Sequence, residues 1–220
     1  MGRGELVTVA VSCPRCGGGV RPPDLMRSEW RCDVHGAVLP FHVAKHIDGD
    51  IVDAARTQVR VPLWCPWPLL PRWMVTGVAW VGDDRTRGRA AAVACSGPAP
   101  LGGPADLLLV SEEPGVGLGP RFAGIDAPDL GQLVRQRMAA TAPDAKVRAA
   151  GHPTPMWAVN TRDDRSVYVG EAKGVWLYAV AWPASAGYVL AEHVTLCDLV
   201  ASVPNELVYG APSPYLHGLA

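Results

Sequence analysis

Between residues 74 and 199, short apolar or alternating runs are separated by turns rich in Gly, Pro, Asp and Ser. Runs of this length and composition are typical of β-strands. The predicted strands are 74–82, 89–97, 105–113, 145–151, 156–161, 165–172, 174–182 and 188–199. Strands joined by short turns predict an α+β domain built mainly on an antiparallel sheet.

One segment has a helical period instead. "PDLGQLVRQRMAA", residues 128–140, opens with Pro128 and Asp129 and has apolar residues at 130, 133, 134 and 138. Proline and aspartate at the start and apolar residues three or four apart predict a helix. A second helix is an alternative in the last strand-like segment, because "AEHVTLCDLVAS", residues 191–202, also fits a 3.6-residue period.

Two stretches eighty residues apart resemble each other. Each has an apolar strand, an Asp-Asp-Arg turn that starts at Asp83 or Asp163, and further strands after it. If this echo reflects a duplication, the domain is a pair of similar halves that meet in one sheet or sandwich, with any site at the seam. Asp-Asp turns are common, so chance similarity is the competing interpretation.

The segment 62–73 combines four prolines with Trp64, Trp67 and Trp73. This proline density excludes a regular helix and favours an extended backbone from which the indole rings project. Either the segment straps across its own sheet and buries the rings, or the rings form a docking surface for a partner. Cys65 is predicted to be an isolated thiol.

The composition bounds the class of protein. Hydrophobic residues make up 49% and charged residues 19% of 220 residues, which suits a globular chain with one ordinary domain and a small appendage. The six-residue apolar run near the N-terminus is too short for a signal peptide, and no run approaches 18 uncharged apolar residues. We therefore expect a cytoplasmic protein without a membrane partner, whose six cysteines are thiols or metal ligands.

Four of the residues between 13 and 35 have the spacing of a metal site. Cys13 and Cys16 form a C-x-x-C pair, and Cys32 and His35 follow as C-x-x-H. Three thiolates and one imidazole suit tetrahedral zinc, and the glycines after Cys16 and His35 suit the tight turns that this needs. The pattern predicts a zinc ribbon with one structural Zn²⁺, because four protein ligands leave no position for a reacting water.

Charge argues against nucleic acid as the partner of this ribbon. Residues 13–35 hold four arginines and three acids, which is 4 − 3 = +1, and three thiolates on a divalent ion subtract one more charge. The whole chain has 20 basic and 21 acidic residues, so it offers no cationic face of the kind that neutralises phosphates. A nucleic-acid-binding ribbon is therefore the third of our hypotheses.

The glycine-rich loop "EEPGVGLGPRFAG" is the best candidate for chemistry. It lacks the Lys-Ser/Thr and the helix start of a phosphate loop, so we predict a flexible loop. Arg121 beside the backbone of Gly117 would still be the best place for a small anion. A small enzyme acting on an anionic substrate at residues 112–124 is the alternative function. A deep pocket lined by two or more of Glu112, Glu113, Arg121 and His193 would favour it.

Several stretches resemble a known family. "CPRCGGGVRPP", "SEWRCDVHG", "PWPLLPRWMVTGVAWVGDDR", "AVACSGPAPLGGPADLLLVSEEPGVGLGPRFAGIDAPD", "AAGHPTPMW" and "GEAKGVWLYAVAWP" look like an uncharacterised actinobacterial family, a domain of unknown function. The resemblance spans nearly the whole chain and implies a bacterial intracellular protein. Such sequences sometimes carry a phosphotransacetylase label, but no residues here resemble an acetyl-CoA or acetyl-phosphate site.

These observations predict a zinc ribbon at 1–40, a connector at 41–62 with one helical turn, a β-rich domain at 63–200 and a tail at 201–220. The expected function is a non-enzymatic module with a structural zinc that binds a protein or small-molecule partner. The binding residues would be Trp64, Trp67 and Trp73 together with Gly117 and Arg121.

Overall fold

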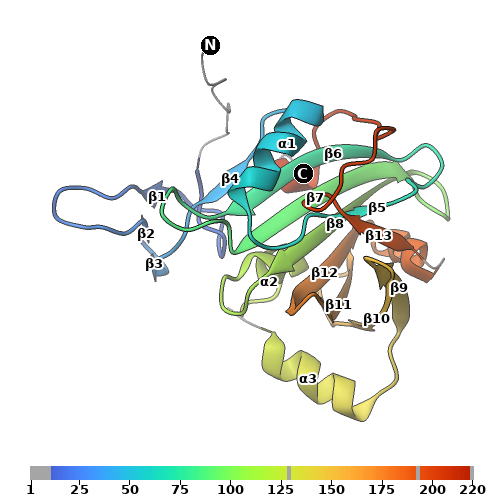
Figure 1. The fold of residues 1–220 in the computed structure, drawn as a ribbon. Coiled ribbons are helices and arrows are strands. Elements are labelled where there is room, and N and C mark those ends of the chain that lie inside the picture. Colours follow the sequence, from blue (N-terminus) through green and yellow to red (C-terminus); the bar gives the residue numbers. More distant parts are fainter. Residues whose placement is uncertain (1–10, 128–129, 192–193, 219–220) are drawn as a thin grey trace.

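The computed structural model describes residues 11–127, 130–191 and 194–218. Its strands form a small three-stranded sheet near the N-terminus and a ten-stranded sheet that makes up most of the molecule (Figure 1). The small sheet has the order β1-β2-β3, with β1 at Val20–Arg21, β2 at Arg31–Cys32 and β3 at Gly36–Ala37.

The large sheet has the order β4-β6-β7-β8-β12-β11-β10-β9-β13-β5. Its neighbouring strands are antiparallel except for the β9–β13 pair, so the predicted antiparallel α+β fold is confirmed. The strands are β4 (Phe41–Val43), β5 (Trp64–Pro66), β6 (Met74–Val81), β7 (Ala90–Pro98), β8 (Pro104–Glu112), β9 (Ala145–Ala149), β10 (His152–Ala158), β11 (Ser166–Ala172), β12 (Val175–Trp182) and β13 (Thr195–Asp198). The helices are α1 (Gly49–Gln58), α2 (Leu118–Ala123), α3 (Gly131–Ala140), α4 (Pro214–His217) and the 3₁₀ helix η1 (Ala184–Ala191).

Both faces of the central strands are buried. Successive side chains of a strand point to opposite faces, and here they enter two separate apolar clusters. In β8, Leu107 and Leu109 join the first cluster, whereas Leu108 and Val110 join the second. Burial on both faces explains why the central strands are nearly continuous apolar runs instead of alternating ones.

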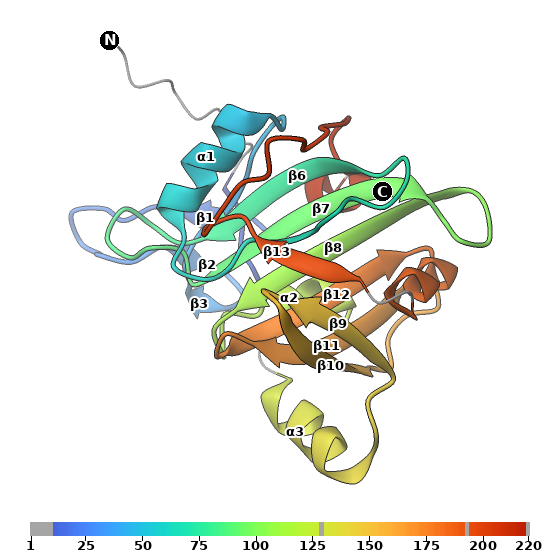
Figure 2. The same cartoon turned by 45° about the vertical axis from the view of Figure 1, so that its right-hand side comes forward.

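The far end of the sheet folds back over its centre. β5, the last strand in the order, packs on β7 and β8, and β13 crosses in front of these strands in Figure 2. Trp64 and Trp73 are therefore buried, with 1% and 5% of their surface exposed, and Trp67 is half-buried. Their burial fits a strap across the sheet and does not fit an exposed docking patch of three indole rings.

Cys65 is not isolated as the sequence suggested. In the β5–β13 pair it lies directly opposite Cys197. The thiol of Cys197 acts to lower the pKa of Cys65, but Cys95 on β7 and burial raise that pKa well above its ordinary value. Three cysteines that are far apart in the chain therefore meet where β5 covers the sheet, which only the tertiary fold determines.

The two Asp-Asp-Arg turns occupy equivalent places. The first joins β6 to β7, and the second joins β10 to β11. In the sheet, β6-β7-β8 and β12-β11-β10 form two sets of three strands that meet at the β8–β12 pair. In this order β7 corresponds to β11, and β8 corresponds to β12. The arrangement fits two similar halves that meet in one sheet, and the duplication itself stays a prediction.

Three segments differ in detail from the sequence prediction. The run 188–199 contains the end of η1 and then β13, with residues 192–193 outside the described part of the chain. The helix predicted for 128–140 is confirmed as α3 at Gly131–Ala140, and its first two residues also lie outside the described part. The connector 41–62 holds β4 and the ten-residue α1, whose N-cap Asp48 accepts a hydrogen bond from Ile51 N at 2.8 Å.

The domain boundaries predicted at residues 40, 62 and 200 stay predictions.

Among the described helices, none has the length and apolar character needed to cross a membrane.

Candidate metal centre

Four side chains of the ribbon meet at one point. The ligand atoms of Cys13, Cys16, Cys32 and His35 all lie within 4.8 Å of one another. Cys13 Sγ is 3.6 Å from His35 Nδ1, Cys16 Sγ is 3.7 Å from Cys32 Sγ, and Cys32 Sγ is 3.8 Å from His35 Nδ1. The spacing of the two sequence pairs therefore brings three sulfurs and one nitrogen together.

The distances fit a tetrahedral ion. With metal–sulfur bonds of about 2.3 Å and metal–nitrogen bonds of about 2.1 Å, two sulfur ligands of a tetrahedral zinc ion lie about 3.8 Å apart, and a sulfur and a nitrogen about 3.6 Å apart. The sulfur–sulfur distance of 3.7 Å and the sulfur–nitrogen distances of 3.6 and 3.8 Å are close to these values. The cluster can hold a metal ion with four protein ligands.

Two tight turns aim the ligands. Gly17 N donates to Cys13 O at 2.9 Å, and Cys13 N donates to Gly18 O at 2.7 Å, which closes the first turn. Gly17 and Gly36 have φ of +76° and +69°, a left-handed conformation that glycine adopts without strain. A glycine therefore follows the second residue of each ligand pair, as the sequence predicted.

The two buried thiols differ in acidity. Burial raises the pKa of Cys13 to about 11, against hydrogen bonds from the backbone N–H groups of Cys16 and Arg15. Burial also acts to raise the pKa of Cys32, but hydrogen bonds from the backbone N–H groups of His35 and Val34 lower it to about 6. Metals bind the thiolate form, so binding here must displace the proton of Cys13.

Arg121 lies against the metal cluster and not in an open anion site. It belongs to α2, and its Nη1 donates to Cys13 O at 3.2 Å. Its guanidinium carbon is 5.2 Å from the ring centres of both Phe41 and Phe122. Burial lowers the pKa of Arg121, whereas the nearby thiols of Cys13 and Cys16 act to raise it. The cation therefore faces the sulfur ligands and joins the ribbon to the sheet.

The backbone of the loop around Gly117 also makes hydrogen bonds within the protein. α2 begins directly after Gly117, which the sequence prediction of a flexible loop had missed. The buried carboxylate of Glu112 accepts a hydrogen bond from Gly119 N at 2.9 Å, so an internal acid occupies the start of this helix. Arg15 of the ribbon donates to Gly115 O at 2.8 Å and to Val116 O at 3.3 Å.

The space beside this loop is small. A cavity of about 130 Å³ is lined by Arg121 and Gly117 but by neither Glu112 nor Glu113. Small-molecule sites usually have about 300–1,000 Å³. His193, the remaining candidate, lies outside the described residues. The substrate pocket expected at 112–124 is therefore not formed by the described residues.

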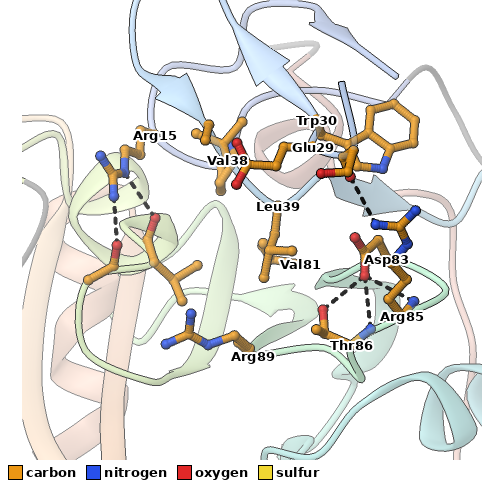
Figure 3. Close-up of a pocket in the computed structure, with 15 residues that line it drawn as sticks. Arg15, Glu29, Trp30, Val38, Leu39, Val81, Asp83, Arg85, Thr86 and Arg89 are labelled. Atoms are coloured by element: carbon orange, nitrogen blue, oxygen red, sulfur yellow. Dashed lines mark hydrogen bonds between the residues drawn. The ribbon is translucent and has the colours of Figure 1, made fainter. Parts of the chain in front are cut away.

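A larger cavity of about 430 Å³ lies between the ribbon and the sheet (Figure 3). Its lining residues are Pro14, Arg15, Ser28, Glu29, Trp30, Ala37, Val38 and Leu39 on the ribbon side, and Val81, Asp83, Arg85, Thr86, Arg89, Gly115 and Val116 on the sheet side. We call this cavity the ribbon–sheet cleft. Figure 3 shows Arg15 and Arg89 toward one end of the cleft and Trp30 and Arg85 toward the other.

Most charged groups of the cleft are held by the protein itself. Asp83 accepts from Thr86 N and Thr86 Oγ1, each at 2.9 Å, and from Arg85 N at 3.1 Å, which outweighs its burial and lowers its pKa. Arg85 Nη1 donates to Ser28 O at 3.2 Å, which ties the turn after β6 to the ribbon. These contacts shape the cleft and leave few of its charges for a ligand.

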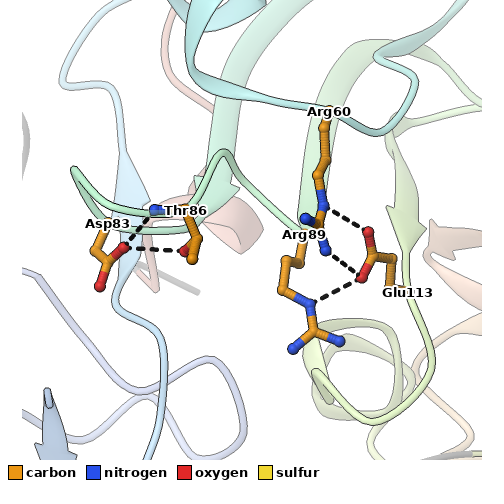
Figure 4. Close-up of polar contacts among 5 residues, drawn as sticks. All are labelled: Arg60, Asp83, Thr86, Arg89 and Glu113. Atoms are coloured by element: carbon orange, nitrogen blue, oxygen red, sulfur yellow. Dashed lines mark hydrogen bonds and ion pairs between the residues drawn. The ribbon is translucent and has the colours of Figure 1, made fainter.

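Arg89 is held on one side only. Glu113 accepts hydrogen bonds from Arg60 Nε and Arg60 Nη2, each at 2.7 Å, and from Arg89 Nε at 2.8 Å (Figure 4). The hydrogen bonds from Arg60 and Arg89 outweigh partial burial and lower the pKa of Glu113. Glu113 therefore holds Arg89 by one edge, and the two terminal nitrogens of Arg89 point away from it in Figure 4. Arg89 could not be singled out from the sequence, because nothing in its local pattern distinguishes it from the other arginines.

The position of Arg121 leads to a test of metal affinity. We expect Arg121→Gln to weaken zinc binding by about tenfold, because mutation of groups next to the metal ligands typically costs 10- to 100-fold. The measurement is competition with a chromophoric chelator at fixed pH. Arg87→Gln, which changes an exposed arginine outside the cluster, is the control and should keep the wild-type affinity. Equal affinities of the two variants would contradict a role of Arg121 at the metal.

A family model described as "Family of unknown function (DUF6758)" matches residues 7–216 of the chain. Neither a curated protein nor a solved structure matches the chain.

Proposed function

We propose that this chain, which belongs to the family of unknown function DUF6758, is a zinc-stabilised module that binds a small anionic molecule in the ribbon–sheet cleft. The observation that carries the proposal is the position of Arg89. Its guanidinium is oriented by Glu113 and leaves two terminal nitrogens for a ligand at a cavity of about 430 Å³.

Zinc is the ion that suits the cluster best. Three sulfurs and one nitrogen at tetrahedral spacing match the donor set of structural zinc sites, and these sites have no open position. The ion would then hold the ribbon in place because some thirty residues with three very short strands cannot build a core of their own. Free thiols at the site suit a reducing compartment, in line with the cytoplasmic location expected from the sequence.

The cleft suits a ligand with one anionic group on an apolar body. Among its charged lining residues, three arginines stand against two acids, which is 3 − 2 = +1. A guanidinium binds a carboxylate or phosphate through two parallel hydrogen bonds, and the free edge of Arg89 has this geometry. Val38, Leu39, Val81 and Val116 add apolar wall, and the ring of Trp30 is half-buried beside them.

A binding measurement tests this proposal. We expect phenyl phosphate to bind the zinc-loaded protein in isothermal titration calorimetry, and Arg89→Gln to weaken binding by about tenfold through loss of a bidentate contact. Arg87→Gln removes a charge of the same sign from the same turn outside the cleft and should leave the affinity unchanged. Chelation of the metal should also weaken binding, since the ribbon forms one side of the cleft.

Two results would overturn the proposal. One is the absence of binding at millimolar phenyl phosphate to the folded, zinc-loaded chain. The other is an equal loss in Arg89→Gln and Arg87→Gln, which would mean that the probe responds to net charge and not to the cleft.

A further inference from the structure

A row of four side chains crosses the centre of the large sheet near the ends of its strands. Met74 of β6 pairs with Ser96 of β7, Ser96 pairs with Asp106 of β8, and Asp106 pairs with Trp182 of β12. Directly paired residues of neighbouring strands point to the same face. The Asp106–Trp182 pair belongs to the β8–β12 seam between the two similar halves, far along the strands from the ribbon–sheet cleft.

This row lines a second cavity of about 460 Å³. The C-terminal segment covers the row and contributes Pro212 and Tyr215 to the wall. Tyr215 stacks on Trp182, with ring centres 4.5 Å apart. A cavity of this size with mainly apolar walls and few polar groups is typical of small-molecule sites.

Asp106 is the charged group of this cavity. It is 5% exposed, and its Oδ1 accepts a hydrogen bond from Ser96 Oγ at 2.8 Å. Thr76 Oγ1 lies 2.7 Å from Ser96 Oγ, so a carboxylate at 106 fixes the direction of the chain, with Thr76 donating to Ser96 and Ser96 to Asp106. Burial raises the pKa of Asp106 to about 6, against the effects of Ser96, Ser213 and His217, so the carboxylate form prevails at pH 7.5.

Trp182 supplies a second, independent feature. It is 2% exposed, and its Nε1 has no hydrogen-bond partner among the described residues. A buried indole N–H usually finds an acceptor, because leaving it without one is costly. The same cavity wall therefore combines an acceptor, Asp106, with an unsatisfied donor, Trp182.

Two neighbouring basic side chains make their hydrogen bonds to backbone carbonyl groups and not to Asp106. Both ring nitrogens of His217 face carbonyl oxygens, at 2.7 Å from Ser213 O and 2.9 Å from Ala44 O. Arg165 lies over the ring of Trp182 at 5.1 Å and donates to Phe122 O at 2.7 Å. Neither residue is among those that line the cavity.

We infer that this cavity at the β8–β12 seam binds a small amine whose ammonium group contacts Asp106 and whose apolar body lies against Trp182, Tyr215 and Met74. A buried carboxylate in an apolar cavity needs a cationic partner, and a protonated amine can supply both the charge and the hydrogen-bond donors. An ether or hydroxyl oxygen on the same ligand would satisfy Trp182 Nε1. This site does not depend on the proposed function of the ribbon–sheet cleft.

The test compares two probes of the same shape, cyclohexylmethylamine and cyclohexylmethanol, at pH 7.5. We expect the amine to bind the wild-type chain at least tenfold more tightly than the alcohol. Asp106→Asn should remove this preference, since the amide keeps the shape of the side chain and loses its charge. Asp163→Asn, in an exposed turn, is the matched control and should keep it.

A second measurement on the wild-type chain does not depend on the folding of the variant. The indole N–H resonance of Trp182, identified by its loss in Trp182→Phe, should shift on addition of the amine. The inference is overturned if the wild-type chain binds neither probe at millimolar concentration, if it binds both equally, or if binding leaves the Trp182 resonance unchanged. Amine preference that survives in folded Asp106→Asn would also overturn it.

Discussion

Cys13→Ser is expected to abolish metal binding at the cluster and with it the ordered ribbon. Cys13 is fully buried, its sulfur lies 3.6 Å from His35 Nδ1, and its N–H and C=O close the first turn. Apparent zinc-binding free energies in small zinc domains are about 10–16 kcal/mol, and this energy becomes folding energy when the site does not exist in the unfolded segment. Metal analysis and hydrogen exchange of residues 11–40 measure the two effects.

The control for this variant is Cys197→Ser, which changes a half-buried thiol outside the metal cluster. It should keep one equivalent of zinc and the exchange protection of the ribbon. In Cys13→Ser the large sheet should keep its protection, because its two apolar clusters do not include the sulfur ligands. Retention of a full equivalent of zinc by Cys13→Ser would refute the assignment of the metal centre.

Trp64→Ala is expected to lower the free energy of unfolding by about 3–5 kcal/mol, the range for removing a large aromatic side chain from a core. Trp64 is 1% exposed in the first apolar cluster, and the ammonium of Lys173 lies 5.6 Å from its ring. The measurement is urea denaturation of the zinc-loaded protein followed by circular dichroism.

Trp67→Ala is the matched comparison, because Trp67 lies three residues away in the same strap and is only half-buried. Trp67→Ala should lower the free energy of unfolding by about 1 kcal/mol or less. If the two variants were equally stable, Trp64 would not belong to the core, and a docking role for the tryptophans of this strap would return to consideration.

The cleft and the metal centre are physically linked through Arg15 and Arg121. Arg15 joins the ribbon to the loop before α2, and Arg121 joins α2 to the backbone of Cys13. Loss of the metal should therefore loosen the ribbon side of the cleft as well as the ligands. Metal loading would then control ligand binding without any contact between ion and ligand.

The metal centre could be predicted from the sequence because its geometry is local. Each ligand pair is separated by two residues, so one tight turn aims both side chains, and a glycine with positive φ follows each pair. The strands could be predicted for a related reason, since apolar runs between turn residues depend on neighbouring positions. β13 and η1 were harder to predict, because the last strand-like segment fits the strand and helix periods equally well.

The composition and the ligand spacing by themselves determined that this chain folds around a strand-rich core and has a four-ligand cluster at its N-terminus. Three placements depend on long-range contacts: Arg121 lies at the metal centre, Arg89 faces a cleft, and Asp106 lies beside Trp182. The physical reason is sequence distance: Arg121 and Cys13 meet because α2 returns to the ribbon, and Asp106 and Trp182 meet because β8 pairs with β12. Contacts of this kind depend on strand order and register, which no local pattern of residues encodes.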